Sequence, residues 1–186
     1  MKKIKILFIL TNLILLNSCN FSDSKKKPEI IEIKKNNKSE IKIEEIKIDG
    51  YLGNYFKIKN FLVNDDSKNS YQALFDFEKS IKSIDIIKFS DLDQNQIKSI
   101  INKILNNVDK MKSKSIKIQR LYFEKLSQNI FNLINIIDPK IKVFHQYCPM
   151  FNQNKGGMWL SSSKEIFNPL FGSSMLKCGY IKSEIN

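Results

Sequence analysis

The sequence predicts a mainly α-helical protein, an antiparallel bundle of about four helices followed by a loop-rich C-terminal segment with one short strand. Between residues 49 and 138, apolar side chains recur every three or four residues, which is the spacing of amphipathic helices. The connections between these stretches are short, which favours antiparallel neighbours in a bundle. After Pro139 the spacing is lost, and glycines and prolines become frequent.

The first 18 residues have the features of a lipoprotein signal peptide. Three lysines precede an apolar run at residues 6–16, which is shorter than the roughly 20 residues that a stable membrane span requires. The run ends in Leu-Asn-Ser-Cys at residues 16–19, which resembles the lipobox of bacterial lipoproteins, where the cysteine is lipidated and becomes the new N-terminus. We therefore expect Cys19 to anchor the mature chain in membrane lipid outside the cytoplasm, at the cell membrane or the outer membrane.

Residues 19–48 are expected to form a flexible tether that follows the lipidated cysteine. They are rich in lysine, contain Pro28, and alternate charges with isoleucines as far as Ile48. Dense charge of both signs is typical of segments that do not fold by themselves. The same alternation would also suit an edge strand, so that alternative stays open.

The charge of the chain argues against a nucleic-acid partner. The 186 residues carry 31 Lys and Arg against 19 Asp and Glu, a formal net charge of +12. Arg120 is the only arginine, and the lysines are spread evenly along the chain rather than clustered with aromatic residues. We read this charge as a solvated surface that favours anionic lipid headgroups.

The expected bundle occupies residues 49–138. Its four periodic stretches are residues 51–62, 71–84, 97–108 and 118–134. Residues that commonly cap helices stand at the starts of the later three: Asp65 and Asp66, then Asp91 and Asp93, then Ser115. About 90 residues of such helix can bury one modest core.

Residues 139–186 form the second predicted part, a motif segment packed on the bundle. Alternating apolar and polar residues at 141–147 predict its short strand. The segment contains the only histidine and the only tryptophan of the chain, two of its three cysteines and three of its five methionines. A concentration of soft and turn-forming residues at one end suggests a binding site.

The soft residues fall into two clusters that predict a metal site. His145, Cys148 and Met150 form the first, and Met175 and Cys178 form the second. If the chain between them folds back, the clusters meet. Thiolates with thioethers select Cu(I), and the methionines favour Cu(I) or Ag(I) over zinc, which prefers cysteine and histidine. Cu(I) is therefore the cofactor that these residues suggest.

A structural disulfide is the alternative. Once Cys19 is lipidated, two cysteines remain outside the cytoplasm, where an even number usually pairs. A bridge from Cys148 to Cys178 would close a loop of about 30 residues and stabilise the fold by about 3–4 kcal/mol. Methionine is also a common core residue, and a single histidine often has a structural role.

Four short motifs carry a family resemblance. They read YCPM, GxWLS, IxNPxFG and MLKCG, at residues 147–150, 157–161, 166–172 and 175–179. They resemble the C-terminal motif of an uncharacterised bacterial domain family, whose members are often small lipoproteins. In that family the domain also occurs attached to periplasmic adaptor subunits of heavy-metal efflux pumps. The resemblance covers most of residues 50–183 and implies a role in heavy-metal handling, with no catalytic residues to carry over.

No catalytic activity is expected. With a single histidine, a Cys–His nucleophile would have to be His145 and Cys148, and no third group is evident to orient the base. There is also no CxxC pair. The sequence thus predicts a membrane-anchored protein that binds a soft metal ion and is linked to metal efflux or homeostasis. The alternative is a non-catalytic interaction module of an envelope complex, with a structural disulfide.

Overall fold

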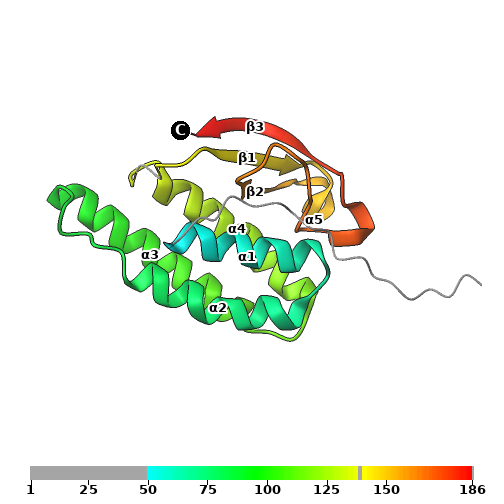
Figure 1. Cartoon of the computed structure of the whole chain (residues 1–186), viewed down its shortest axis with the longest axis horizontal. Coiled ribbons are helices and arrows are strands. Elements are labelled where there is room, and N and C mark those ends of the chain that lie inside the picture. The colour runs from blue at the N-terminus through cyan, green and yellow to red at the C-terminus, as the bar shows by residue number, and fades with distance from the viewer. Residues whose placement is uncertain (1–49, 138–139, 186) are drawn as a thin grey trace, which may run out of the picture. The chain divides into compact units, whose positions relative to one another are not determined.

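A computed structural model describes residues 50–137 and 140–185. The predicted signal peptide, Cys19 and the predicted tether lie outside the described residues. The described residues all belong to one unit, in which four long helices carry a small antiparallel sheet (Figure 1). None of the helices in this described part is long and apolar enough to cross a membrane.

The prediction of a bundle of about four helices is confirmed. The long helices are α1 (Gly50–Val63), α2 (Ser67–Lys82), α3 (Asp91–Met111) and α4 (Ile116–Ile134). Each packs against the next in the chain, and their apolar faces supply most of the core. The longest connection, between α2 and α3, has eight residues, so consecutive helices lie side by side.

One of the expected side-chain caps, Asp66, occurs in the structure, and the cap of α3 is made by a different residue. The Asp66 carboxylate accepts a hydrogen bond from the backbone N–H of Asn69 (2.9 Å), and Ser90, not an aspartate, caps α3 by accepting from Asp93 (3.2 Å). Ser115 occupies the N-cap position of α4 without a side-chain hydrogen bond to the helix. Asp65 has a left-handed backbone (φ 59°) and serves another purpose, described below.

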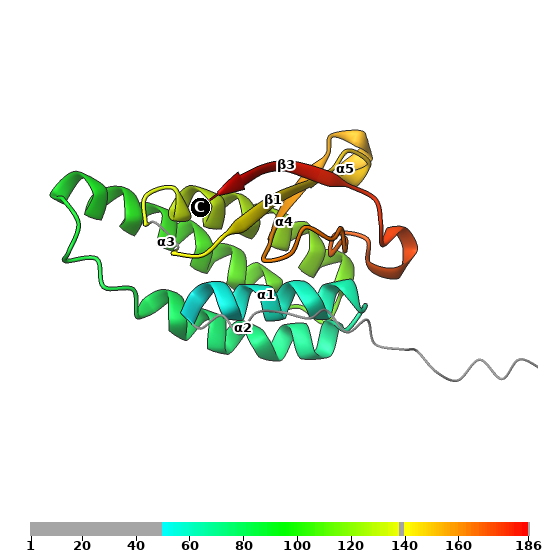
Figure 2. The ribbon, with the colours of Figure 1, turned by 45° about the horizontal axis from the view of Figure 1, so that its top comes forward.

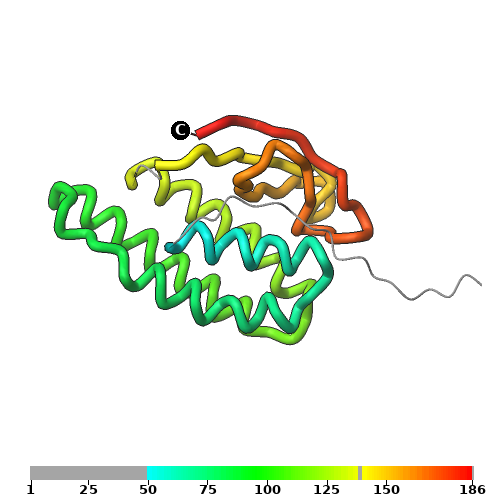
Figure 3. Tube along the Cα trace, viewed as in Figure 1, coloured from blue at the N-terminus to red at the C-terminus, as the bar shows by residue number. Residues whose placement is uncertain are grey.

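The C-terminal part holds more strand than the sequence predicted. The expected strand is β1 (Val143–Cys148), and it pairs with β2 (Gly157–Ser161) and β3 (Tyr180–Ile185) in the order β2-β1-β3. Every residue of β2 is buried, so β2 lacks the alternation that identifies a half-buried strand. β3 is mostly exposed and lies on the outer side of the sheet (Figure 3).

The sheet joins the bundle through β2, on the side formed by α1 and α4 (Figure 2). The buried Tyr55 hydroxyl lies 2.6 Å from Ser127 Oγ and accepts a hydrogen bond from the backbone N–H of Leu160 (3.0 Å). The Tyr55 ring stacks on Phe123 with 5.1 Å between centroids. Tyr55 of α1 therefore connects α4 to the edge of β2. It also satisfies the Leu160 N–H, which points away from β1 at the sheet edge.

Candidate functional site

The fold brings two distant cysteines together. Cys148 is the last residue of β1 and is fully buried, whereas Cys178 is half-buried on the stretch between the short 3-10 helix η1 (Gly172–Met175) and β3. Their sulfurs lie 2.8 Å apart, although 30 positions separate the residues in the chain. The two predicted clusters thus meet through their cysteines.

Asn168 fixes the path of the chain at Cys178. Its buried side-chain amide donates a hydrogen bond to the Cys178 carbonyl (2.9 Å) and accepts one from the backbone N–H of Leu170 (2.8 Å). Its backbone N–H also donates to the Leu176 carbonyl (2.8 Å). Because three hydrogen bonds from one residue span this turn, the position of Cys178 is set by side-chain chemistry and not by a helix or strand.

Trp159 and Gly179 shape the other side of the site. The Trp159 indole N–H donates to the Gln146 side chain (2.7 Å), whose amide in turn donates to the Ser163 carbonyl (2.9 Å). A Cβ at position 179 would lie 2.8 Å from the Trp159 ring and 2.9 Å from the Tyr147 carbonyl oxygen. Only glycine lets the chain pass this closely over the indole directly after Cys178.

The only arginine holds the same segment to the helices. Arg120 donates to the carbonyls of Pro169 (3.0 Å) and Leu62 (2.8 Å) and to the Asp65 carboxylate (2.5 Å). The second oxygen of Asp65 accepts from the Ser173 hydroxyl (2.5 Å). We call Arg120, Asp65 and Ser173 the Arg120 clamp. Burial would raise the pKa of Asp65, but the hydrogen bonds from Ser173 and Arg120 outweigh it and lower that pKa.

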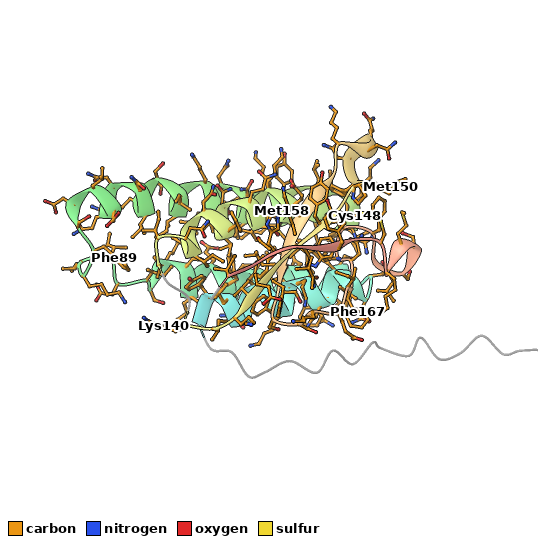
Figure 4. The ribbon with its side chains drawn as sticks, turned by 90° about the horizontal axis from the view of Figure 1, so that it is seen from above. Phe89, Lys140, Cys148, Met150, Met158 and Phe167 are labelled. Atoms are coloured by element: carbon orange, nitrogen blue, oxygen red, sulfur yellow. The ribbon has the colours of Figure 1, made fainter. Side chains whose placement is uncertain are left out.

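The three methionines of the C-terminal segment differ in their exposure to solvent. Met150 is 48 % exposed, and its backbone N–H donates a hydrogen bond to the Cys178 sulfur. Figure 4 shows Cys148 and Met150 at the same end of the molecule. Met175, half-buried, ends η1, and its carbonyl accepts from the Cys178 N–H (3.0 Å). Met158, inside β2, is buried and belongs to the core.

His145 does not lie with the two cysteines as the sequence suggested. It precedes Cys148 by three positions in β1, which pairs regularly with β2, so their side chains leave opposite faces of the strand. Its ring packs on Phe131 with 4.9 Å between centroids, and Nδ1 lies 3.3 Å from Ser183 Oγ. Burial, helped by the charge of Lys182, lowers the pKa of His145, so the ring is neutral. In the part of the chain that the structure describes, no three His, Cys, Asp or Glu residues gather closely enough to hold a metal ion.

At neutral pH the Cys178 thiol of the pair is protonated. The hydrogen bond with Cys148, together with burial, raises the pKa of Cys178 to about 11. An ion that binds here as a thiolate complex must therefore displace a proton. The arrangement offers two chemistries: coordination by two sulfurs, or oxidation to a disulfide.

Three residues important for the site were missed by sequence reasoning. Gln146, Asn168 and Arg120 are not candidate ligands, but they position Trp159 and the segment that carries Cys178. A signal existed for Arg120, since a single arginine among so many lysines suggests a geometry that lysine cannot provide. Asn168 also stands inside one of the four short motifs.

The fold and the site together define a mainly helical bundle that carries a small sheet with a pair of thiols. Residues 51–142 match the family model described as "Protein of unknown function (DUF3347)". The match covers just under half of the chain, namely the four helices and the connection to β1, and it ends before the motifs at residues 147–179. No curated protein and no solved structure matches the chain.

Proposed function

We propose that the chain is a lipid-anchored extracytoplasmic protein that binds a soft monovalent ion, Cu(I) or Ag(I), and takes part in metal efflux or homeostasis. The observation that carries this proposal is the approach of Cys148 and Cys178 to 2.8 Å between sulfurs, with the partly exposed Met150 beside them. Thiolates and thioethers are the donors that select Cu(I). The link to efflux is an inference from the resemblance of the four motifs.

Sulfur donors alone make up the proposed site. Cys148 and Cys178 supply the anionic ligands, and Met150 or Met175 supplies a thioether, while His145 is excluded by its position on the other face of β1. With metal–sulfur bonds of about 2.3 Å, the length found for zinc thiolates, two sulfurs on one ion stand about 3.7–4.6 Å apart. The sulfurs, now 2.8 Å apart, would therefore separate by about 1–2 Å on binding. Rotation of the half-buried Cys178 side chain can supply this separation while Asn168 holds the backbone.

A structural disulfide remains the second candidate, and the same distance favours it. A disulfide bond is about 2.05 Å long, so sulfurs at 2.8 Å need little movement to form one. In that state the protein would be an interaction module without a metal. Oxidation would also remove the thiolates on which metal binding depends.

An anaerobic Cu(I) titration of the reduced full chain against a competing chelator tests the proposal. We expect one ion per chain, binding that weakens as the pH falls, and a much greater loss of affinity from Cys148→Ser or Cys178→Ser than from Met150→Leu. Met111→Leu is the matched control, because Met111 is a buried thioether of α3 outside the site. If the double serine variant binds Cu(I) as tightly as the natural protein, the metal site is wrong. If thiols 148 and 178 are oxidised on isolation and reduction restores no binding, the disulfide is the better account.

A further inference from the structure

A groove lies next to the thiol pair, between the first half of α4, the turn from β1 to β2 and the segment after Pro169. Its volume is about 580 Å³, which is within the range of ligand-binding clefts. Its apolar walls are formed by Ile116, Ile118, Leu121, Phe151, Leu170 and Phe171. Ile118 and Met150, which also line it, are 37 % and 48 % exposed, so apolar surface at this groove faces solvent.

The groove shares its walls with the thiol site. Met150 lines the groove with its side chain and donates its backbone N–H to the Cys178 sulfur. Phe171 precedes Gly172, which lies against the Arg120 clamp. A molecule in this groove would therefore contact the same two segments that hold Cys148 and Cys178 in place.

The turn that forms one wall is strained. Asn152, Gln153 and Asn154 have consecutive left-handed backbones, with φ of 50°, 58° and 63°. Side chains other than glycine adopt this conformation at a cost, and such strain collects at sites that bind ligands. A hydrogen bond from the Gly156 N–H to the Phe151 carbonyl (2.9 Å) closes the turn and keeps Met150 and Phe151 at the groove.

The charge of the groove is positive. Among the described residues that line it, Lys117 and Arg120 are charged and none is acidic. Arg120 forms an ion pair with Asp65, so Lys117 supplies the positive charge beside the apolar walls of the groove. An occupant with acidic residues beside an apolar centre would match this surface.

We propose that the groove binds a short apolar, methionine-bearing segment of a partner protein, flanked by acidic residues, which exchanges the soft ion with the thiol pair. This inference rests on the proposed function. Met150 is a proposed thioether ligand that also lines the groove and is 48 % exposed, so an ion held through its sulfur would lie at the wall of the groove. Among the described residues, no group of three His, Cys, Asp or Glu side chains is placed to complete the shell. A partner methionine is a donor of the same softness, so the ion can pass between them without a harder ligand. Flexible methionines also suit surfaces that accept peptides.

Binding is tested with the metal-free full chain in lipid nanodiscs and three fluorescent synthetic peptides of about 12 residues. The first has an apolar Met-containing centre with aspartate flanks, the second has the same centre with lysine flanks, and the third has the aspartate flanks with a serine centre. We expect only the first to bind well by anisotropy. Ile118→Asp should weaken binding of the first peptide about tenfold or more. Leu92→Asp is the control at another exposed apolar residue (69 % exposed), and it should change the affinity for that peptide less than about twofold.

The outcomes separate this inference from the proposed function. Any of three results would overturn the groove as a docking site, whatever the Cu(I) titration shows. They are an equal loss of peptide affinity from Ile118→Asp and Leu92→Asp, equal binding of all three peptides, and no binding of any peptide. Self-association that Ile118→Asp abolishes would identify a second copy as the occupant and would also overturn it. If the first peptide docks, it should also take up Cu(I) from the loaded protein faster than its Met→Leu counterpart. Equal rates would overturn the exchange role alone.

Discussion

Single polar side chains do much of the positioning in this protein. Tyr55, Gln146 and Asn168 are fully buried, and each joins segments that are far apart in the chain. A buried polar group that loses its partner costs free energy, so each of these residues favours one arrangement of the chain over others. The thiol pair depends on this specificity because neither cysteine lies within a helix, and Cys178 lies outside any strand.

Replacing Tyr55 by Phe should destabilise the fold by about 1–3 kcal/mol. The change keeps the ring on Phe123 but removes the oxygen that accepts from the Leu160 N–H and pairs with Ser127. Urea denaturation followed by circular dichroism would measure the loss. Tyr71→Phe is the control, because the half-buried Tyr71 ring packs on Phe75 of its own helix, α2. Equal stability of the two variants would contradict the bridging role of Tyr55.

The raised pKa of Cys178 gives a prediction of pH dependence. In the reduced protein the folded state keeps the Cys178 proton up to a pKa of about 11, whereas the unfolded chain loses it near the ordinary value of 9.0. Above that ordinary value the unfolded state binds fewer protons than the folded one, so the free energy of unfolding should fall as the pH rises from about 9 to about 11.

The same shift predicts how Cys178 reacts. Cys148→Ala removes the largest cause of the raised pKa, so alkylation of Cys178 by iodoacetamide at pH 8 should become about tenfold faster or more. Site-resolved mass spectrometry would follow the reaction, with Met150→Leu as a variant that keeps both thiols. An unchanged rate in Cys148→Ala would show that the neighbouring sulfur does not set the pKa.

Among the elements, η1 and the segment before it show how loops are held without regular structure. The Arg120 clamp fixes them to α4 and to the corner between α1 and α2 by four hydrogen bonds. Lysine could not replace Arg120, because a single ammonium cannot reach three acceptors along a planar fork. The clamp sets where η1 begins, and thereby where Cys178 arrives.

Gly172→Ala should disrupt this element far more than Gly50→Ala. Both glycines have left-handed backbones (φ 61° and 76°), so the conformational cost of alanine is similar. A Cβ at 172 would overlap Arg120 and Asp65, whereas a Cβ at 50 meets nothing within 4 Å. We expect Gly172→Ala to lower the free energy of unfolding by about 2 kcal/mol more than Gly50→Ala, measured by urea denaturation. Similar losses of stability in the two variants would mean that Arg120 and Asp65 can move aside at little cost.

At the scale of the molecule, a helical bundle supports a sheet, and the thiol pair lies where β1 ends. The bundle supplies the large apolar core, and β2 joins that core through its edge. Cys178 is half-buried, Met150 is 48 % exposed and the groove opens at the surface, whereas Cys148 is part of the core.

The proposed anchor is tested by Cys19→Ala in the full chain. We expect the variant to lose acyl labelling and to leave the membrane fraction, because the acyl chains supply the membrane affinity. Cys178→Ser is the control, since it also removes one thiol but leaves the anchor intact. Unchanged acyl labelling and fractionation of Cys19→Ala would exclude lipidation at this residue.

The sequence by itself determined the helices and the first strand. Their apolar spacing is a local property, because a helix or a half-buried strand must repeat apolar residues with its own period. The sequence also showed that the soft residues gather at one end of the chain. These predictions needed no knowledge of distant contacts.

Tertiary structure alone decided the rest. Every residue of β2 is buried, so β2 carries no alternation. β3 is mostly exposed, and Asn168 and the Arg120 clamp hold the segment that leads the chain back to pair with β1. Whether the cysteines meet depends on contacts across 30 positions. His145 is kept apart from them because β1 stays paired with β2, and therefore extended, through to Cys148. Local periodicity determines elements, whereas a site built from several elements is determined by the buried hydrogen bonds between them.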